Sequence, residues 1–270
     1  MDIYNFAKDL IVEAGQFIEK RMLESFHVDS KSNPDDLVTD VDRETEQFLS
    51  QRISEQYPTH RIIGEEGQGH DVHDNKGVLW IIDPIDGTLN FVHQSENFAI
   101  SIGIFIDGQP YCGLIYDCMK ADLYHAKYKE GAFLNNVPLE KAKQVPLSRS
   151  LIAVNPKRFL NERIRTPFFS IMSKSRSVRS YGSAALEFTM LARGQISALL
   201  FFRLHPWDYA GGVILTNELG YKTSNVFGQD LPLFGTTSVI AGNPLIHQEL
   251  LAYFENDKEL KSLHDETHSL

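Results

Sequence analysis

One stretch, residues 79–93, constrains this chain more than any other. The apolar run from Val78 to Ile82 predicts a short buried strand, which Asp83-Pro84 ends because proline cannot extend a hydrogen-bonded ladder. Asp86-Gly87-Thr88 then predicts the start of a helix, since Asp and Thr favour N-terminal positions and the free N–H groups there attract anions. Two carboxylates that can bind a cation therefore lie within a few residues of a helix start that can bind an anion.

This density of carboxylates favours a bound cation. Two such charges about 5 Å apart, at an effective dielectric constant near 20, repel each other by roughly 3 kcal/mol. A divalent cation removes that cost, and Asp and Glu oxygens suit Mg²⁺, which keeps several waters and is completed by substrate phosphate. The first interpretation is therefore a metal-dependent phosphate site. Asp-Pro and Asp-Gly are also ordinary turn dipeptides, so this stretch alone leaves a solvated turn open.

The composition argues against several kinds of partner. A formal net charge of −10 disfavours nucleic acid, whose binding depends on Lys and Arg that neutralise phosphates. No segment is apolar for long enough to cross a bilayer and the first residues lack a signal-peptide pattern, so we expect a cytoplasmic protein with no membrane partner. Cys112 and Cys118 are too few for a zinc cage and are expected to be reduced core thiols. Bound divalent metals would reconcile this acidic chain with an anionic substrate.

The first half of the chain, residues 1–145, is expected to be an α+β subdomain that carries most of the metal ligands. Its patterns predict an antiparallel sheet with two helices, and a mobile loop over the polar segment 27–40. The predicted helices cover 2–25 and 42–56, and the predicted strands cover 61–63, 78–82, 97–106, 111–116 and 122–134.

The second half, residues 146–270, alternates strand and helix patterns, which predicts an α/β subdomain. The predicted strands cover 151–154, 177–179, 196–202 and 238–241, and the predicted helices cover 161–172, 183–192, 207–218 and the residues after Pro244. The last ten or so residues, which are polar and charged, are expected to fray.

Acidic residues elsewhere in the chain can complete a cation site. Asp42 falls at the beginning of a predicted helix, where a carboxylate is favoured as a cap in any case. Glu65 and Glu66 lie between two glycines, and in isolation they would be a solvated turn. Asp208 lies at a strand-to-helix junction, where a lone Asp is expected to be an N-terminal cap.

Taken together, G-E-E at 64–66, D-P-I-D-G-T at 83–88 and P-W-D-Y-A-G-G at 206–212 resemble the inositol monophosphatase family of Mg²⁺-dependent, lithium-sensitive phosphatases. The resemblance covers nearly the whole chain, including L-V-T-D-V-D at 37–42, and the motifs occur in the right order. It implies a layered α-β-α-β-α sandwich of the inositol monophosphatase and fructose-1,6-bisphosphatase type, usually found as a homodimer. The second subdomain would then contribute Asp208 and the substrate pocket.

The resemblance also implies a set of metal ligands for two or three Mg²⁺ ions. Glu65, Asp83 and the backbone carbonyl of Ile85 would hold the first ion. Asp83, Asp86 and Asp208 would hold the second, and a third, weaker ion would rest on Glu65 and waters. The substrate would be a small phosphate ester whose phosphate bridges the metals.

The mechanism implied by the resemblance is attack by a metal-activated water in line with the leaving group, with no covalent phosphoenzyme. Glu65, together with a Thr88 hydroxyl held by Asp42, would orient that water and take its proton. The substrate contacts would come from Asp86, Gly87, Thr88, Gly182, Ser183, Ala184, Arg203 and Asp208.

The substrate itself is less constrained by the sequence. Inositol 1-phosphate is the first candidate, yet family members that handle it commonly carry a Glu where this chain has Phe201. The nearby Arg203 could suit a second phosphate. An NADP(H) 2′-phosphatase, a fructose-1,6-bisphosphatase and a nucleotide 3′-phosphatase therefore stay open.

Three other classes of protein compete with this interpretation. A haloacid-dehalogenase-type phosphatase needs two acids two residues apart, whereas Asp83 and Asp86 are three apart with a proline between them. A catalytically silent relative that binds another protein would have no reason to keep a costly acid cluster. A simple Ca²⁺ module is disfavoured because no loop has EF-hand spacing.

Overall fold

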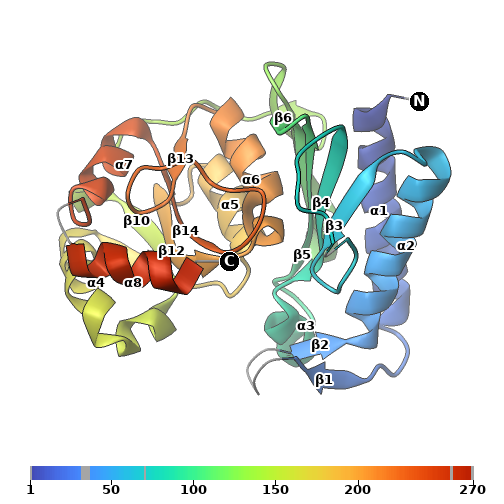
Figure 1. Ribbon diagram of the computed structural model, residues 1–270, viewed down its shortest axis with the longest axis horizontal. Coiled ribbons are helices and arrows are strands. Elements are labelled where there is room, and N and C mark those ends of the chain that lie inside the picture. Colours follow the sequence, from blue (N-terminus) through green and yellow to red (C-terminus); the bar gives the residue numbers. More distant parts are fainter. Residues whose placement is uncertain (1, 32–36, 70, 256–257, 269–270) are drawn as a thin grey trace.

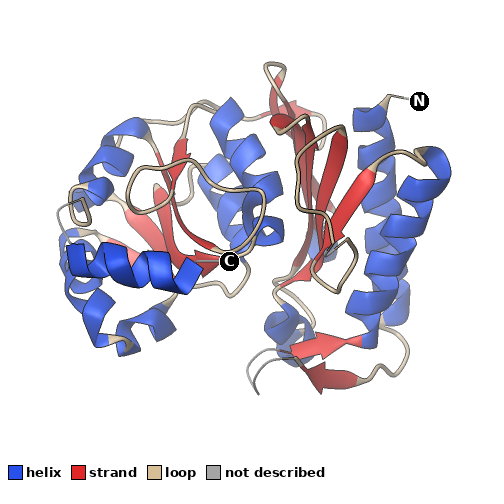
Figure 2. Ribbon diagram, in the orientation of Figure 1, coloured by secondary structure: helices blue, strands red, loops and turns tan. Residues whose placement is uncertain are grey.

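The computed structural model of the protein describes residues 2–31, 37–69, 71–255 and 258–268. Within these ranges most of the chain lies in helices and strands (Figure 2). The α-helices are α1 (Ile3–Arg21), α2 (Asp40–Gln56), α3 (Thr88–Gln94), α4 (Glu162–Lys174), α5 (Ala184–Ala192), α6 (Pro206–Glu218), α7 (Pro244–Leu251) and α8 (Lys258–His268). Short 3-10 helices lie at Cys118–Lys120, Leu147–Arg149 and Pro156–Leu160.

The strands form two large sheets and one small ribbon. The ribbon pairs β1 (Val28–Ser30) with β2 (Leu37–Thr39). The seven-stranded sheet contains, in spatial order, β3 (Arg61–Gly64), β4 (Val78–Asp86), β5 (Ala99–Ile106), β6 (Gln109–Asp117), β7 (Asp122–Lys127), β8 (Gly131–Leu134) and β9 (Val137–Pro138). The five-stranded sheet contains, in spatial order, β11 (Ser177–Arg179), β10 (Leu151–Val154), β12 (Ala198–Leu204), β14 (Thr237–Gly242) and β13 (Lys222–Ser224). Only the β3–β4 pair is parallel in the first sheet, whereas β10 is parallel to both of its neighbours in the second.

The helices and sheets lie in alternating layers (Figure 1). Helices α1 and α2 cover the outer face of the seven-stranded sheet, and α5 and α6 lie between the two sheets. Helices α4, α7 and α8 cover the outer face of the five-stranded sheet. This arrangement confirms the predicted α-β-α-β-α sandwich.

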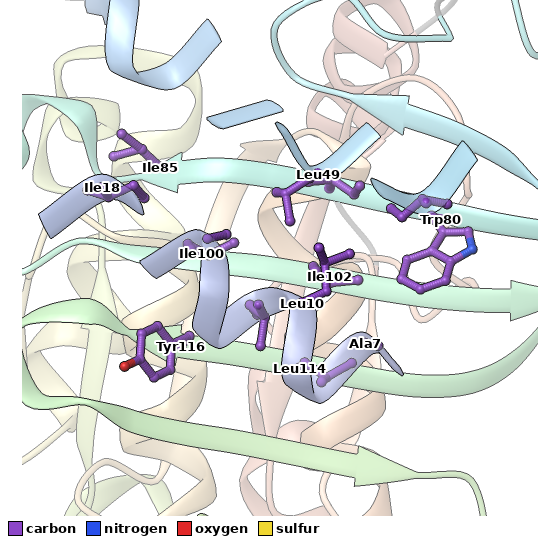
Figure 3. Packing of buried hydrophobic residues seen from close by; sticks show 14 of the residues in the cluster. Ala7, Leu10, Ile18, Leu49, Trp80, Ile85, Ile100, Ile102, Leu114 and Tyr116 are labelled. Carbon is purple, nitrogen blue, oxygen red and sulfur yellow. The ribbon is translucent and has the colours of Figure 1, made fainter. Parts of the chain in front are cut away.

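Helix α1 shows why the layers hold together. Its apolar residues recur every three or four positions, so they lie on one face of the helix. Leu10 and Ile18 of this face are buried against Ile100 and Ile102 of the sheet (Figure 3). Each such side chain contributes about 1.5–3 kcal/mol through the apolar surface it removes from water. The helix ends at Arg21, a few residues before the predicted end.

Helix α6 packs closely on the seven-stranded sheet. A Cβ atom at Gly113 of β6 would overlap the carbonyl oxygen of Gly211 and lie 2.8 Å from Cβ of Ile214. Glycine at 113 therefore lets the helix approach the strands at backbone distance. Because α6 begins with the predicted Pro-Trp-Asp motif, this contact sets the depth at which Asp208 lies.

Two sequence-based predictions of local structure were wrong in part. Strand β4 does not end at Ile82 but continues to Asp86, with a register shift against β5 between Asp83 and Asp86. Pro84 lies at this irregularity, where the ladder needs no N–H donor. The segment predicted as a mobile loop includes β1 and β2, and residues 32–36 of that prediction lie outside the described residues.

The predicted fraying of the C-terminus was also wrong for the residues that the structure describes. Helix α8 runs to His268, and its Leu260 and His264 are buried. They are one helical turn apart, so a single face of α8 packs on the rest of the molecule.

Among the described residues, no helix is both long and apolar enough to cross a membrane. Cys112 and Cys118 are buried free thiols, as predicted. Burial raises the pKa of both thiols, so they remain protonated at neutral pH.

Candidate active site

Three carboxylates that are distant in the sequence meet at one point of the fold. Asp83 and Asp86 come from β4, and Asp208 comes from the first turn of α6. One oxygen atom from each lies within 4.8 Å of the other two. The seven-stranded sheet and the helix layer next to it thus supply a joint acidic cluster.

Neighbouring backbone and hydroxyl groups hold all three carboxylates in place. Asp83 Oδ1 accepts the Ile85 N–H at 3.0 Å. Asp86 Oδ2 accepts hydrogen bonds from the Ser183 hydroxyl and, at 2.7 Å, from the Ala185 N–H at the start of α5. Asp208 accepts the N–H of His205 at 2.7 Å, as part of the capping box that begins α6. The predicted capping role of Asp208 is therefore present, and it uses one of the two carboxylate oxygens.

Burial and mutual repulsion raise the pKa values of the three aspartates. Burial, followed by the charges of Glu65, Asp86 and Asp208, raises the pKa of Asp83 well above its usual range. Burial raises the pKa of Asp86 to about 6, against the hydrogen bonds from Ser183 and Ala185. Burial and the neighbouring acids also raise the pKa of Asp208. A buried group of oxygen ligands that repel each other fits a hard divalent cation such as Mg²⁺.

Glu65 follows β3 and lines the same cleft as the three aspartates. Its N–H donates to the Ile82 carbonyl at 3.3 Å, which ties the residue to β4. The Lys31 ammonium lies 2.9 Å from Glu65 Oε1 and 2.5 Å from Glu66 Oε1. Burial raises the pKa of Glu66 to about 7, although Lys31 opposes that shift. The acidic pair is thus divided, with Glu65 at the aspartate cleft and Glu66 further from solvent.

The Asp42 carboxylate accepts hydrogen bonds from two neighbouring residues. Its Oδ2 accepts the Thr39 N–H at 2.9 Å in the capping box that begins α2, which is the predicted structural role. Its Oδ1 accepts the Thr88 hydroxyl at 3.1 Å. Burial raises the pKa of Asp42 to about 6, against the hydrogen bonds from Thr39. The Thr88 hydroxyl is also 3.1 Å from the Ile85 carbonyl, so its single hydrogen has two possible acceptors.

The segment after β4 lines the cleft with backbone. Gly87 precedes α3 with φ of 99°, a left-handed conformation that side chains disfavour. Ile85, Gly87 and Thr88 line the cleft together with Gly182 from the opposite wall. A small anion in this cleft would meet backbone groups as well as the acid cluster.

A second cavity continues from the first and shares Asp86, Leu89, Gly182 and Asp208 with it. Its additional lining includes the predicted substrate residues Ser183, Ala184 and Arg203, together with Asn155, Glu187 and Phe201. All the predicted site residues except Asp42 therefore line one or the other of two connected cavities.

Sequence reasoning did not single out three residues that shape the cleft. Lys31 was seen only as part of a polar segment. Asn90 donates to the Asn97 carbonyl at 2.8 Å and to the Tyr181 carbonyl at 2.7 Å, which joins α3 to the opposite wall. Glu187 accepts the Tyr181 N–H at 2.7 Å, and burial raises its pKa to about 8. No periodicity marks such contacts, because each depends on a partner far away in the chain.

The layered sandwich and its buried acid cluster define a class, the metal-dependent phosphatases that act on phosphate monoesters. The model of the Inositol monophosphatase family matches residues 1–259. The chain belongs to this family, which is Mg²⁺-dependent, and it is a phosphoric monoester hydrolase.

Individual relatives agree with this assignment. The inositol-1-monophosphatase of Bacillus subtilis (strain 168) is 46% identical over 254 residues, which cover 92% of this chain and 95% of that protein. The crystal structure of inositol monophosphatase II from Staphylococcus aureus MSSA476 is 45% identical, superposes with a TM-score of 0.93 and covers all of both chains. A more distant structure, an inositol monophosphatase/NADP phosphatase complexed with Mg²⁺ and phosphate, is 26% identical, with a TM-score of 0.86 over 94% of this chain and 95% of that one.

Proposed function

We propose that the protein hydrolyses a small phosphorylated polyol, with inositol 1-phosphate as the first substrate. The observation that carries the proposal is the meeting of Asp83, Asp86 and Asp208 within 4.8 Å, in a cleft that Gly87 and Thr88 also line. The names of the relatives support the substrate, since a structure 44% identical to this chain is described as bound to inositol monophosphate.

Five residues are proposed to hold the Mg²⁺ ions: Glu65, Asp83, Asp86, Asp208 and Ile85 through its backbone carbonyl. When bound, Mg²⁺ would act as a Lewis acid, which lowers the pKa of water and stabilises the charge that develops on the leaving oxygen. We propose that the site holds two ions and that a third is held more weakly through Glu65.

The proton of the attacking water is proposed to pass to Glu65, with Thr88 orienting that water. Once the Ile85 carbonyl serves as a ligand, the Thr88 hydroxyl donates its one hydrogen to Asp42. The lone pairs of the Thr88 oxygen would then be free to accept a hydrogen bond from a water molecule. Asp42 therefore acts by fixing which way the Thr88 hydroxyl points.

The substrate is proposed to lie across the two connected cavities. Its phosphate would meet the N–H groups of Gly87 and Thr88, next to Asp86 and Asp208. Its alcohol would extend toward the wall formed by Gly182, Ser183, Ala184 and Arg203.

A second candidate substrate is a nucleotide 2′-phosphate, as in 2′-AMP or NADP. Phe201 lines the alcohol pocket where a hydroxyl acceptor is expected for inositol, and Arg203 adds a cation to the same wall. An aromatic ring and a guanidinium suit a base and a second phosphate better than they suit a polyol. A structure 44% identical to this chain is described as bound to 2′-AMP.

The test is phosphate release with Mg²⁺ from inositol 1-phosphate, 2′-AMP, NADP, fructose 1,6-bisphosphate and a 3′-phosphorylated nucleotide at equal enzyme concentration. We expect the highest kcat/KM with inositol 1-phosphate. If kcat/KM is higher with 2′-AMP or NADP, and Arg203→Met lowers that value selectively, the nucleotide 2′-phosphate replaces inositol 1-phosphate as the proposed substrate. No release from any of these substrates would contradict both.

We also propose that the protein works in the cytoplasm, as its sequence pattern suggests, and that it is a homodimer, as the family resemblance implies. Sedimentation equilibrium would check the dimer, and a monomer at micromolar concentration would contradict it.

A further inference from the structure

Glu46 of α2 lies beneath the turn that carries the acidic pair. Its side chain is 4% exposed, although it is a glutamate outside the aspartate cluster. Its Oε2 accepts the Glu66 N–H at 2.7 Å, and its Oε1 accepts the Gln68 N–H at 3.0 Å. The two oxygens of one carboxylate are thus each bonded to a backbone N–H of the same turn.

The strand that leads into this turn leaves no room for a side chain against Glu46. A Cβ atom at Gly64 would overlap the Glu46 carboxylate. The Gly64 N–H donates to the Gln68 carbonyl at 2.9 Å, which closes the turn over residues 64–68. The carboxylate therefore packs directly against the backbone on one side of Glu65 and accepts N–H groups on the other.

Glu65 lines the cleft with three aspartates that repel it, and its ion pair with Lys31, 2.9 Å from Oε1, lies outside that cluster of carboxylates. Its charge contributes to raising the pKa values of Asp83, Asp86 and Asp208. A turn bonded only to itself could relieve this repulsion by moving Glu65 away from the cleft. The two backbone N–H groups of the turn that are bonded to the buried Glu46 carboxylate oppose that movement, because leaving a buried polar group without its partner costs free energy.

We infer that Glu46 is a positioning residue, which holds the turn at residues 64–68 so that the Glu65 carboxylate stays beside Asp83. This inference rests on the proposed role of Glu65 as a metal ligand. Glu46 lines neither of the two connected cavities, and its carboxylate accepts N–H groups from the backbone of the turn.

The first test compares Glu46→Gln with Glu55→Gln, a matched loss of charge on the exposed side of the same helix. The amide of Gln offers one acceptor oxygen and places an N–H₂ group against the second backbone N–H. Supporting groups of this kind typically change metal affinity by 10–100-fold. We expect Glu46→Gln to weaken Mn²⁺ binding, measured by electron paramagnetic resonance, by about tenfold or more. Glu55→Gln should bind Mn²⁺ as the parent does.

Phosphate release supplies a second readout for the same variants. We expect Glu46→Gln to need about tenfold more Mg²⁺ for half-maximal rate and to have a lower kcat, with KM for substrate within about twofold of the parent. Parental Mn²⁺ affinity in folded Glu46→Gln would overturn the inference. Absence of phosphate release by the parent would overturn the proposed function, but the Mn²⁺ comparison would still decide the role of Glu46.

A double-mutant cycle separates positioning from general loss of stability. Gly64→Ala alone should weaken Mn²⁺ binding, because the new methyl group displaces the Glu46 carboxylate. In a Glu46→Ala background the same change should add little, since the carboxylate that it would clash with is gone. Additive effects of the two changes would contradict the inference. If Glu46→Gln does not fold, Glu46→Asp, which keeps both acceptor oxygens on a shorter stem, replaces it in the Mn²⁺ comparison.

Discussion

The Thr88 hydroxyl lies 3.1 Å from Oδ1 of Asp42, so that α3 and α2 are joined by a hydrogen bond beside the acid cluster. Asp42 is 1% exposed and gives its other oxygen to the start of its own helix. The two oxygens of one carboxylate thus connect a structural cap with the residue proposed to orient the attacking water.

Thr88→Val keeps the shape of the side chain but removes its hydroxyl. We expect kcat for phosphate release to fall by about 10²–10⁴-fold, which is the usual contribution of a group that positions or transfers a proton. The matched control is Thr45→Val on α2, where the buried hydroxyl has no hydrogen-bond partner among the described residues. The control should keep full activity and stability. Equal activity of the two variants would remove Thr88 from the mechanism.

Asp208→Asn removes one charge from the cluster while the amide oxygen can still accept the His205 N–H. In the presence of a chelator we expect a melting temperature a few degrees above that of the parent, because repulsion among the acids is relieved. Activity should fall by at least about 100-fold. Differential scanning calorimetry with and without Mg²⁺ measures the first effect, and Asp9→Asn on the exposed side of α1 is the control. A variant that gains as much stability from Mg²⁺ as the parent would show that Asp208 is not a ligand.

Gly113→Ala tests the close packing of α6 on β6. The added methyl group would overlap the Gly211 carbonyl, so the helix must move away from the sheet. We expect a loss of about 1–3 kcal/mol in the free energy of unfolding, as is usual for overpacking, measured by urea denaturation. Because α6 carries Asp208, the Mg²⁺ concentration for half-maximal rate should rise as well. Loss of stability without any change in Mg²⁺ dependence would show that the cluster does not depend on the depth of α6.

His264 makes the docking of α8 sensitive to pH. Its Nε2 lies 2.8 Å from the Ser238 hydroxyl and accepts the Ser238 N–H at 3.4 Å, so a proton at Nε2 would end that contact. Burial lowers the pKa of His264 below its usual 6.5 in the folded state, against an opposing contribution from Asp265. The unfolded chain therefore binds this proton at a higher pH than the folded protein does. The stabilising effect is complete above pH 6.5 and is lost as the pH falls toward the lowered pKa.

The measurement is the melting temperature between pH 7.5 and 5.5. We expect His264→Asn to be less stable than the parent at pH 7.5 and to lose less stability on acidification. His27→Asn, at a site where the imidazole is 76% exposed, should keep the parental pH dependence. An unchanged slope in His264→Asn would assign the pH sensitivity to another group.

The sequence predicted the features that depend on local pattern or on short motifs. The apolar repeat of α1, the paired strands β5 and β6, and the alternating second half were recognisable because periodicity reflects which face is buried. The family resemblance was confirmed, and with it the layered fold. The roles of individual site residues and the subdomain boundary near residue 145 stay predictions.

What the sequence could not predict depends on contacts between distant segments. Pro84 suggested the end of a strand, but β4 continues past it because the register shifts there, and such a shift depends on the partner strand. Leu260 and His264 looked like part of a polar tail, and only the surface that receives them accounts for their burial. Glu46 lies within a predicted helix, and no local pattern marks it, because its burial depends on the distant turn at residues 64–68.

Asp83 and Asp86 belong to the seven-stranded sheet, whereas Asp208 belongs to the helices next to it. The geometry of the site therefore depends on how the two layers are aligned. A small sliding movement between the layers would separate the ligands while every helix and strand stayed intact. Gentle warming should accordingly abolish catalysis before circular dichroism detects any loss of secondary structure.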